Sequence, residues 1–400
     1  MDYWAEIAGQ PAAVRALEHA ASPGGAQELS HAWLITGPPG SGRSNIALRF
    51  AAALVARDPG DREAVFAQVR ARTHPDVVVL ATQKVVIGID DVRDIVTTAY
   101  YAPAEGRHRV IVIEDADRMP ERTSNVLLKA LEEPPERTVW VLCAPSEADL
   151  LPTIRSRTRS VRLVTPSPEQ IAGLLHERDG VDAAAAERAA RLAQSHIGMA
   201  RRLAADPEAM ARRERTIEVA LGVVTLSDAM AAANELLKVA ESDASALTEQ
   251  LDAAEREQAL RGLGIAPGAA VPPQLRAQIR ALEEDQKRRA TRSLRDGIDR
   301  ILTDLLSLYR DAALEALGAG LELVNREQAA RIAELAEGWG AERVLGAVAA
   351  VEQARDRLSR GVTPGLVLEA MFAGTVMAGA AAAGTAGADG TARTVARAGR

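Results

Sequence analysis

The first 165 residues alternate short apolar runs with stretches of helical periodicity. Four continuous runs, rich in β-branched residues, are typical of strands buried on both faces: residues 32–36, 77–80, 110–113 and 139–143. Helical patterns separate them, for example over residues 44–57 and 89–100. Because strands that alternate with helices usually pair in parallel, we expect an α/β domain over residues 1–165. Its parallel sheet should carry helices on both faces.

The pattern changes after residue 165. The sequence Ser167-Pro168-Glu169-Gln170 has the features of a helix start, with proline in the first turn, and no strand pattern follows it. Apolar residues instead recur at helical spacing, as at Leu294, Ile298, Ile301, Leu305 and Leu308. We therefore expect a helical segment over residues 166–206 and an all-α domain over residues 207–377.

Two stretches of the C-terminal half differ from the rest. Residues 241–295 are heavily charged and are broken by a Gly/Pro-containing stretch at 262–273, which predicts a charged helical hairpin. Residues 378–400 consist mostly of alanine, glycine, threonine and arginine, a composition that favours a disordered tail.

Composition and charge narrow the class of protein. Hydrophobic residues make up 47% and charged residues 26% of the 400 residues, as in soluble globular proteins. A net charge of −7 gives no overall attraction to nucleic acid, so any contact with DNA must be local or made through partners. Lysine occurs at four positions only, so nearly all the basic residues are arginine.

The single cysteine, Cys143, excludes disulfides within the chain and cysteine-rich zinc sites, so no zinc is expected. Because it ends an apolar run, we expect it to pack as a small buried hydrophobe. The first residues lack the basic start and apolar core of a signal peptide. The uncharged stretch 371–384 is too short and too rich in alanine and glycine to span a bilayer. We expect a cytoplasmic protein without membrane contact.

A glycine-rich loop follows the first predicted strand. Its sequence is that of a phosphate-binding P-loop in which arginine replaces lysine: Gly37-Pro38-Pro39-Gly40-Ser41-Gly42-Arg43-Ser44. Glycines let backbone N–H groups turn toward a polyphosphate, and the following helix directs its positive end at the same anion. Ser44 stands where a hydroxyl would bind magnesium, but the planar guanidinium of Arg43 does not replace a compact ammonium. We expect a degenerate site for ATP or ADP with magnesium; a glycine turn without a ligand is the alternative.

Two adjacent carboxylates, Glu114 and Asp115, follow the predicted strand 110–113. A buried strand that ends in two acids has the form of a Walker B motif, in which one acid serves the magnesium shell and the next polarises the attacking water. The usual Asp-then-Glu order is inverted here, and a misplacement of about 1 Å can cost roughly 100-fold in rate. The alternative is a solvated acidic strand end.

Two further motifs carry a family resemblance. One is an apolar-striped helix stopped by two prolines, Leu127-Leu128-Lys129-Ala130-Leu131-Glu132-Glu133-Pro134-Pro135, and the other is Arg155-Ser156-Arg157-Thr158. Together they resemble the clamp-loader branch of the AAA+ ATPases, in which an L-L-K-x-L-E-E-P-P helix precedes a Ser-Arg-Cys motif. Shorter matches are Ala8-Gly9-Gln10, Ser30-His31-Ala32-Trp33, Thr73-His74-Pro75-Asp76 and Glu105-Gly106-Arg107-His108-Arg109-Val110. The motifs cover about residues 3–205, and the remainder resembles the family in helical character only.

The resemblance implies an AAA+ P-loop domain (1–165), a helical lid (166–206) and an all-α collar that mediates oligomerisation (207–377). In this family ATP lies at subunit boundaries, and Arg157 takes the position of an arginine finger that completes a neighbour's site. Such fingers are worth roughly 10³–10⁵ in rate. The alternative is that Arg155, Arg157, Arg159 and Arg162 form a solvated basic strip. Thr158 replaces the motif's cysteine, and residues 56–73 contain no cysteine for the family's zinc module.

The departures from the family suggest a subunit without ATPase activity of its own. The P-loop cation is altered, the two acids are inverted and Ala144-Pro145-Ser146 is a weak match to the first sensor. Arg201 or Arg202 stands near the second sensor, but a surface arginine on a helix is an equal alternative.

The resemblance then implies a non-motor, or stator, subunit that donates Arg157 in trans within a DNA polymerase holoenzyme. Its expected partners are delta- and gamma/tau-type subunits in a hetero-pentamer, and through them a sliding clamp and primed DNA during replication. The alternatives are an ATP-hydrolysing gamma/tau-type subunit and an AAA+ ATPase of DNA repair or remodelling.

Overall fold

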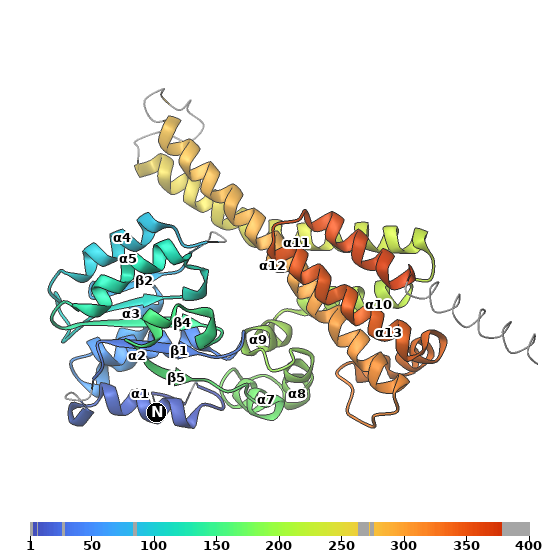
Figure 1. Cartoon of the computed structure of the whole chain (residues 1–400), viewed down its shortest axis with the longest axis horizontal. Coiled ribbons are helices and arrows are strands. Elements are labelled where there is room, and N and C mark those ends of the chain that lie inside the picture. The colour runs from blue at the N-terminus through green and yellow to red at the C-terminus, as the bar shows by residue number, and fades with distance from the viewer. Residues whose placement is uncertain are drawn as a thin grey trace, which may run out of the picture. The chain divides into compact units, whose positions relative to one another are not determined.

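The computed structural model describes residues 3–377 except 6, 26–28, 83–85, 263–271 and 273–275. The chain divides into two compact units, Met1–Asp206 and Pro207–Arg400, each with a buried core of its own (Figure 1). The predicted disordered tail, 378–400, and most of the predicted break in the hairpin lie outside the described residues.

The first unit is built on a five-stranded parallel sheet with the order β2-β3-β4-β1-β5. The strands are β1 (Ala32–Thr36), β2 (Val77–Leu80), β3 (Arg109–Ile113), β4 (Thr138–Ala144) and β5 (Arg159–Arg162). The four predicted strands are confirmed to within one residue at each end. In the centre of the sheet Ala32 pairs with Trp140 and Thr36 with Ala144, so β1 and β4 end at the same edge.

Helices cover both faces of this sheet, as predicted. Trp33 and Ile35 of β1 face a core formed with α1 (Pro11–Ala21), α2 (Arg43–Val55) and α3 (Arg62–Arg70). Ala32 and Leu34 face the opposite core, formed with α4 (Ile89–Ala99), α5 (Glu121–Glu132) and α6 (Pro152–Arg155). Alternate side chains of one strand thus bury on opposite faces, which is why the strand is apolar throughout.

The sequence pattern does not predict the fifth strand. In β5 only Val161 is buried, and Arg159, Ser160 and Arg162 are exposed. The strand lies at the edge of the sheet beside β1, so it needs no continuous apolar run.

Three short helices complete the first unit: α7 (Pro168–Glu177), α8 (Ala183–Leu192) and α9 (Ile197–Ala205). The predicted helix start at Ser167 is confirmed, and Pro168 occupies its first turn. The Ser167 hydroxyl accepts a hydrogen bond from the Gln170 backbone N–H, and the Gln170 side chain accepts one from the Ser167 N–H. This capping box fixes where the lid begins.

The described residues of the second unit form helices joined by loops, with no strand among them. Its long helices are α10 (Pro207–Leu221), α11 (Leu226–Gly262), α12 (Arg276–Ala316) and α13 (Ala329–Ser359), and residues 364–377 are also helical. The apolar residues predicted at helical spacing on α12, such as Ile298, Leu305 and Leu308, are buried in the core. None of the described helices combines the length and the apolar character that crossing a membrane requires.

Helices α11 and α12 extend together as a charged pair, seen as the yellow and orange helices of Figure 1. Ion pairs between side chains join the two helices. Arg289 contacts Asp252 at 3.0 Å and Glu255 at 2.9 Å, and Arg256 contacts Glu283 at 2.6 Å. Each helix of the pair therefore contributes both acidic and basic side chains to these ion pairs.

Candidate functional site

The predicted P-loop lies at the carboxyl edge of the sheet, between β1 and α2. The Gly37 N–H donates to the Ala144 carbonyl at the end of β4, and the Ser41 N–H donates to the Pro38 carbonyl. Gly40 and Gly42 have φ values of 82° and 88°, in the left-handed region that favours glycine. The backbone therefore forms a tight turn that delivers the chain directly into α2.

Two features of this loop fit a phosphate. Helix α2 begins at Arg43, one residue before the predicted start, and the first N–H groups of a helix have no partner within it. The Ser41 hydroxyl is buried and has no hydrogen-bond partner among the described residues. Open backbone donors at a helix N-terminus, together with a buried hydroxyl, form a surface suited to an anion.

The guanidinium of Arg43 contacts groups of its own chain. Its Nη1 donates to the Gly37 carbonyl at 2.9 Å, and its Nη2 lies 4.0 Å from Asp115 Oδ1. Only 14% of the side chain is exposed. The guanidinium thus closes back on the first residue of the loop.

The two acids after β3 are also engaged by arginines. Glu114 lies 3.8 Å from Arg72, and Asp115 lies 3.5 Å from Arg118 in addition to its contact with Arg43. Asp115 has a φ of 51°, an uncommon backbone conformation for a residue with a side chain. A magnesium ion would have to compete with these guanidinium groups for both carboxylates. The residues present therefore fit the anion of a nucleotide but do not fit its metal ion.

Two of the residues predicted near the sensors have partners close to their own elements. The Ser146 hydroxyl accepts a hydrogen bond from the Ala148 N–H and caps the short helix η4 (Glu147–Asp149). Arg201 Nε donates to Asp179 Oδ2 at 2.8 Å, in the turn after α7. This ion pair is compatible with the alternative of a surface arginine on a helix.

The lid touches the P-loop through Gly40. The Ile197 N–H at the start of α9 donates to the Gly40 carbonyl at 3.2 Å. A methyl group added to Gly40 would lie 2.4 Å from Cγ of His196, so the imidazole packs directly on the glycine backbone. Sequence reasoning did not foresee this contact, because it joins residues that are 156 positions apart and neither carries a local signal.

Cys143 is buried, as predicted, and burial raises the pKa of its thiol. It lies at the end of β4, beneath the carbonyl of Arg43. Among the described residues, no group of three or more histidine, cysteine or acidic side chains could hold a metal ion.

Arg157 lies at the opposite edge of the sheet from the P-loop. It follows α6 and precedes β5, next to Ser30 and His31, which precede β1. The P-loop follows the other end of β1, and strands rise about 3.3 Å per residue, so the two sites are roughly 15 Å or more apart. Arg157 is therefore remote from the predicted P-loop of its own chain.

The guanidinium of Arg157 is held at the surface by three contacts. Its Nη1 donates to the Thr153 carbonyl at 2.8 Å and to the Ser156 hydroxyl at 3.2 Å, and its Nη2 lies 2.6 Å from Glu132 Oε1. The side chain is 35% exposed and borders a shallow depression of about 560 Å³. Sequence reasoning identified Arg157 but missed Glu132 as its partner.

The arginines around Arg157 do not share one environment. Arg155 belongs to α6 and is exposed, whereas the guanidinium of Arg159 lies over the Trp33 ring, 5.0 Å from its centroid. Arg162 is an exposed residue at the end of β5. Arg155, Arg159 and Arg162 are all exposed, so the alternative of a solvated basic strip stays open beside that of an arginine finger.

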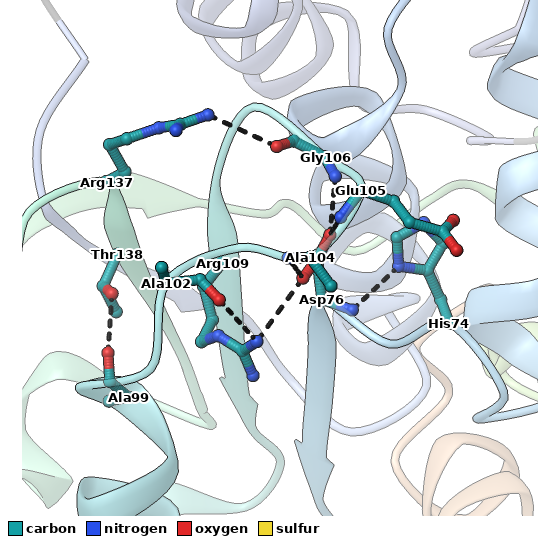
Figure 2. Close-up of polar contacts among 10 residues, drawn as sticks. All are labelled: His74, Asp76, Ala99, Ala102, Ala104, Glu105, Gly106, Arg109, Arg137 and Thr138. Carbon is teal, nitrogen blue, oxygen red and sulfur yellow. Dashed lines mark hydrogen bonds and ion pairs between the residues drawn. The ribbon is translucent and has the colours of Figure 1, made fainter.

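A buried carboxylate, Asp76, organises the amino edge of the sheet (Figure 2). It accepts hydrogen bonds from the backbone N–H groups of residues 104–106, at 2.5 to 2.7 Å, and one from Arg109 at 3.4 Å. Burial acts to raise the pKa of Asp76, but the three backbone donors and Arg109 outweigh it and hold the pKa below its ordinary value. Two of the sequence motifs quoted above, around His74 and Gly106, therefore form one polar tie.

The same loop is held from its other side by Arg137. Its guanidinium donates to the carbonyls of Arg107 and Gly106, and Figure 2 shows it reaching across to the loop that Asp76 binds. Arg137 has a φ of 61°. This residue follows the Pro134-Pro135 turn, so the turn after α5 and the loop before β3 are joined.

Comparisons with known proteins agree with these motifs. The family model described as DNA polymerase III, delta subunit, matches residues 9–167. The model described as DNA polymerase III, delta subunit, C terminal, matches residues 284–373. The first match contains the P-loop, both acids and Arg157, and the two matches together cover more than half of the chain.

Individual relatives match mainly the first unit. DNA polymerase III subunit delta' from Pseudomonas aeruginosa is 35% identical over 158 residues, which are 38% of this chain and 48% of the relative. DNA polymerase III subunit gamma/tau from Mycobacterium tuberculosis is 31% identical over 188 residues, which are 44% of this chain and 32% of the relative. The chain thus spans about half or less of the length of these relatives.

Among solved structures, a DNA polymerase III gamma subunit-related protein from Thermotoga maritima aligns with 91% of this chain and 99% of its own. The identity is 18% and the TM-score is 0.44, values too low to support a conclusion. The family matches over both units, together with the relatives of the first unit, are what decide the assignment. By these matches the chain belongs to the clamp-loader family.

Proposed function

We propose that this chain is a non-motor subunit of a DNA polymerase III clamp loader that supplies Arg157 to the nucleotide of a neighbouring subunit. One observation carries the proposal: Arg157 lies at the surface, at the sheet edge opposite to its own P-loop. From there it can serve only a nucleotide that another molecule presents. A delta'-type role is favoured over a gamma/tau-type role, because the chain's own acids are engaged by arginines.

The chemistry asked of Arg157 is electrostatic. During phosphoryl transfer, negative charge spreads over the equatorial oxygens, and a guanidinium delivered from a neighbour stabilises it. The planar donors of arginine match two such oxygens at once. The Thr153 carbonyl and the Ser156 hydroxyl hold Nη1, one of the two terminal nitrogens, so little freedom is lost when the guanidinium binds.

The chain's own P-loop would retain nucleotide without hydrolysing it. The N–H groups at the start of α2 and the Ser41 hydroxyl would hold phosphate oxygens of ATP or ADP. Neither Glu114 nor Asp115 would be available for a magnesium shell without displacing an arginine. The loop then has a structural use, because it also receives the lid at Gly40.

The proposed partners follow from the family. They are delta- and gamma/tau-type subunits of a cytoplasmic hetero-pentamer, held together mainly by the helical second unit. The sliding clamp and primed DNA would be reached through that assembly. An AAA+ protein of DNA repair or remodelling remains the second candidate, and a pull-down of native partners separates the two.

The test is a loader reconstituted with the full chain. Arg157→Ala should lower the clamp- and DNA-stimulated ATPase by about 10³-fold at the one site it serves, while assembly stays intact. Arg155→Ala removes an exposed guanidinium two residues away and should leave the rate unchanged. Alone, the chain should bind nucleotide with negligible turnover. Equal rates for the two variants would refute the finger, and robust turnover by the isolated chain would support a gamma/tau-type motor.

A further inference from the structure

The side chain that holds Arg157 carries a charge of its own. Glu132 is the last residue of α5, and its Oε1 lies 2.6 Å from Arg157 Nη2. Both side chains are partly exposed, 49% for Glu132 and 35% for Arg157. We refer to this pair as the Glu132–Arg157 latch.

The position of Glu132 is fixed by its surroundings. The imidazole Nε2 of His31 contacts the Leu131 carbonyl at 3.0 Å, which joins the end of α5 to the start of β1. Pro134 and Pro135 stop the helix directly afterwards. Glu132 and Glu133 are both exposed, and the ion pair with Arg157 is made by Glu132.

The three acceptors around Arg157 do not act alike. The Thr153 carbonyl and the Ser156 hydroxyl are neutral, so they orient the guanidinium without cancelling its charge. Glu132 forms an ion pair with Arg157 at 2.6 Å, which neutralises the charge that a transferring phosphoryl group would need. Its oxygen also occupies a donor direction that a phosphate oxygen would take.

We propose that Glu132 is an autoinhibitory partner that keeps Arg157 neutralised until a neighbour's nucleotide competes for it. This inference rests on the proposed function of Arg157 in trans. A polyphosphate carries more charge than one carboxylate and can displace it. Exposed ion pairs shift equilibria by only about two- to fivefold, so the latch regulates Arg157 without blocking it.

The test uses the same reconstituted loader and follows ATPase against ATP concentration, with and without clamp and primed DNA. Glu132→Gln keeps the shape of the side chain and removes its charge. We expect it to raise kcat/KM about two- to fivefold in the absence of clamp and DNA. The fully stimulated kcat should stay unchanged, because saturating nucleotide already displaces the carboxylate. Glu133→Gln is the matched control and should behave as the wild type.

A double variant separates the latch from other effects of the substitution. In an Arg157→Ala background, Glu132→Gln should change nothing further, since no guanidinium remains to be neutralised. Glu132→Asp should retain most of the inhibition, because it keeps the charge one methylene farther away. A gain that persists without Arg157 would overturn the inference, and so would a fall in stimulated kcat.

The proposed function of Arg157 and the latch can be refuted separately. If Glu132→Gln matches Glu133→Gln while Arg157→Ala is defective, the latch is refuted and the proposed function stands. If Arg157→Ala is fully active, the proposed function itself is refuted.

Discussion

The charged side chains around the P-loop contact groups of the chain itself. The loop keeps its left-handed glycines and the helix that begins after them. Arg43 donates to Gly37 and approaches Asp115, and Arg72 approaches Glu114. The charges that would act on nucleotide and magnesium are thus compensated within the chain.

A substitution of the buried Asp76 should lower the free energy of unfolding of the first unit by a large amount. Asparagine offers one acceptor oxygen where the carboxylate serves three N–H groups, and it leaves Arg109 buried without its charged partner. We expect Asp76→Asn to lower the free energy of unfolding by about 3 kcal/mol at pH 7. The control Asp90→Asn, at an exposed carboxylate, should change it by less than about 0.5 kcal/mol. Urea unfolding followed by tryptophan fluorescence suits this measurement, since three of the four tryptophans lie in the first unit.

The same carboxylate predicts a pH dependence. The pKa of Asp76 is lowered in the folded state, so its contribution to stability is complete above the ordinary aspartate pKa of about 3.9. That contribution is lost as the pH falls below this value toward the folded pKa. The difference in stability between wild type and Asp76→Asn should therefore be constant from about pH 7 to pH 5 and shrink below about pH 4. A difference that grows on acidification would contradict the assignment.

At the scale of elements, apolar patterning located four of the five strands, including the edge strand β2, and missed the other edge strand, β5. β1 begins and ends at the predicted residues because it is buried on both faces, and β2 keeps an apolar run of the predicted length although only Val77 is fully buried. β5 was not predicted because three of its four residues are polar and exposed. Part of the candidate site could likewise be predicted from the sequence, because motifs located the P-loop, both acids and Arg157. The partners Glu132 and His196 come from other elements, and no local pattern encodes such contacts.

The docking of the lid on the P-loop gives a test at this scale. Gly40 and Gly180 both have positive φ, 82° and 68°, but only Gly40 faces a neighbouring side chain, that of His196. Alanine at either position should lower the free energy of unfolding by about 1–2 kcal/mol, because a residue with a side chain is strained at positive φ. Gly40→Ala should lose roughly a further 1–3 kcal/mol, because its methyl group overlaps the imidazole. Urea unfolding of the two variants compares them directly, and equal losses would mean that the His196 contact contributes nothing.

At the scale of the whole molecule, the two units have separate cores. Sheet, flanking helices and lid fall within residues 1–206, and the long helices fall within residues 207–400. Apolar residues of the second unit, such as Leu302 and Phe372, pack among themselves. Each unit has the size and the buried core of an independent domain.

Separate expression tests this division. Fragments 1–206 and 207–377 should each be soluble and unfold cooperatively on heating, with a single calorimetric transition. The first fragment should still bind nucleotide if the P-loop retains it, because the loop and the lid residues that touch it are all present. A fragment that unfolds without a cooperative transition would show that the cores depend on each other.

The placement of the P-loop and Arg157 at the two ends of β1 gives the first unit a direction. If a subunit presents Arg157 at one edge and its own P-loop to a neighbour at the other edge, it can join its neighbours only head to tail, through two different surfaces. Such contacts carry a polarity that a face-to-face dimer lacks. In the proposed function, a subunit that does not hydrolyse ATP at its own P-loop still completes a neighbour's site with Arg157. The order of subunits around a ring would then matter, and exchanging this chain with a neighbour would change which boundaries can work.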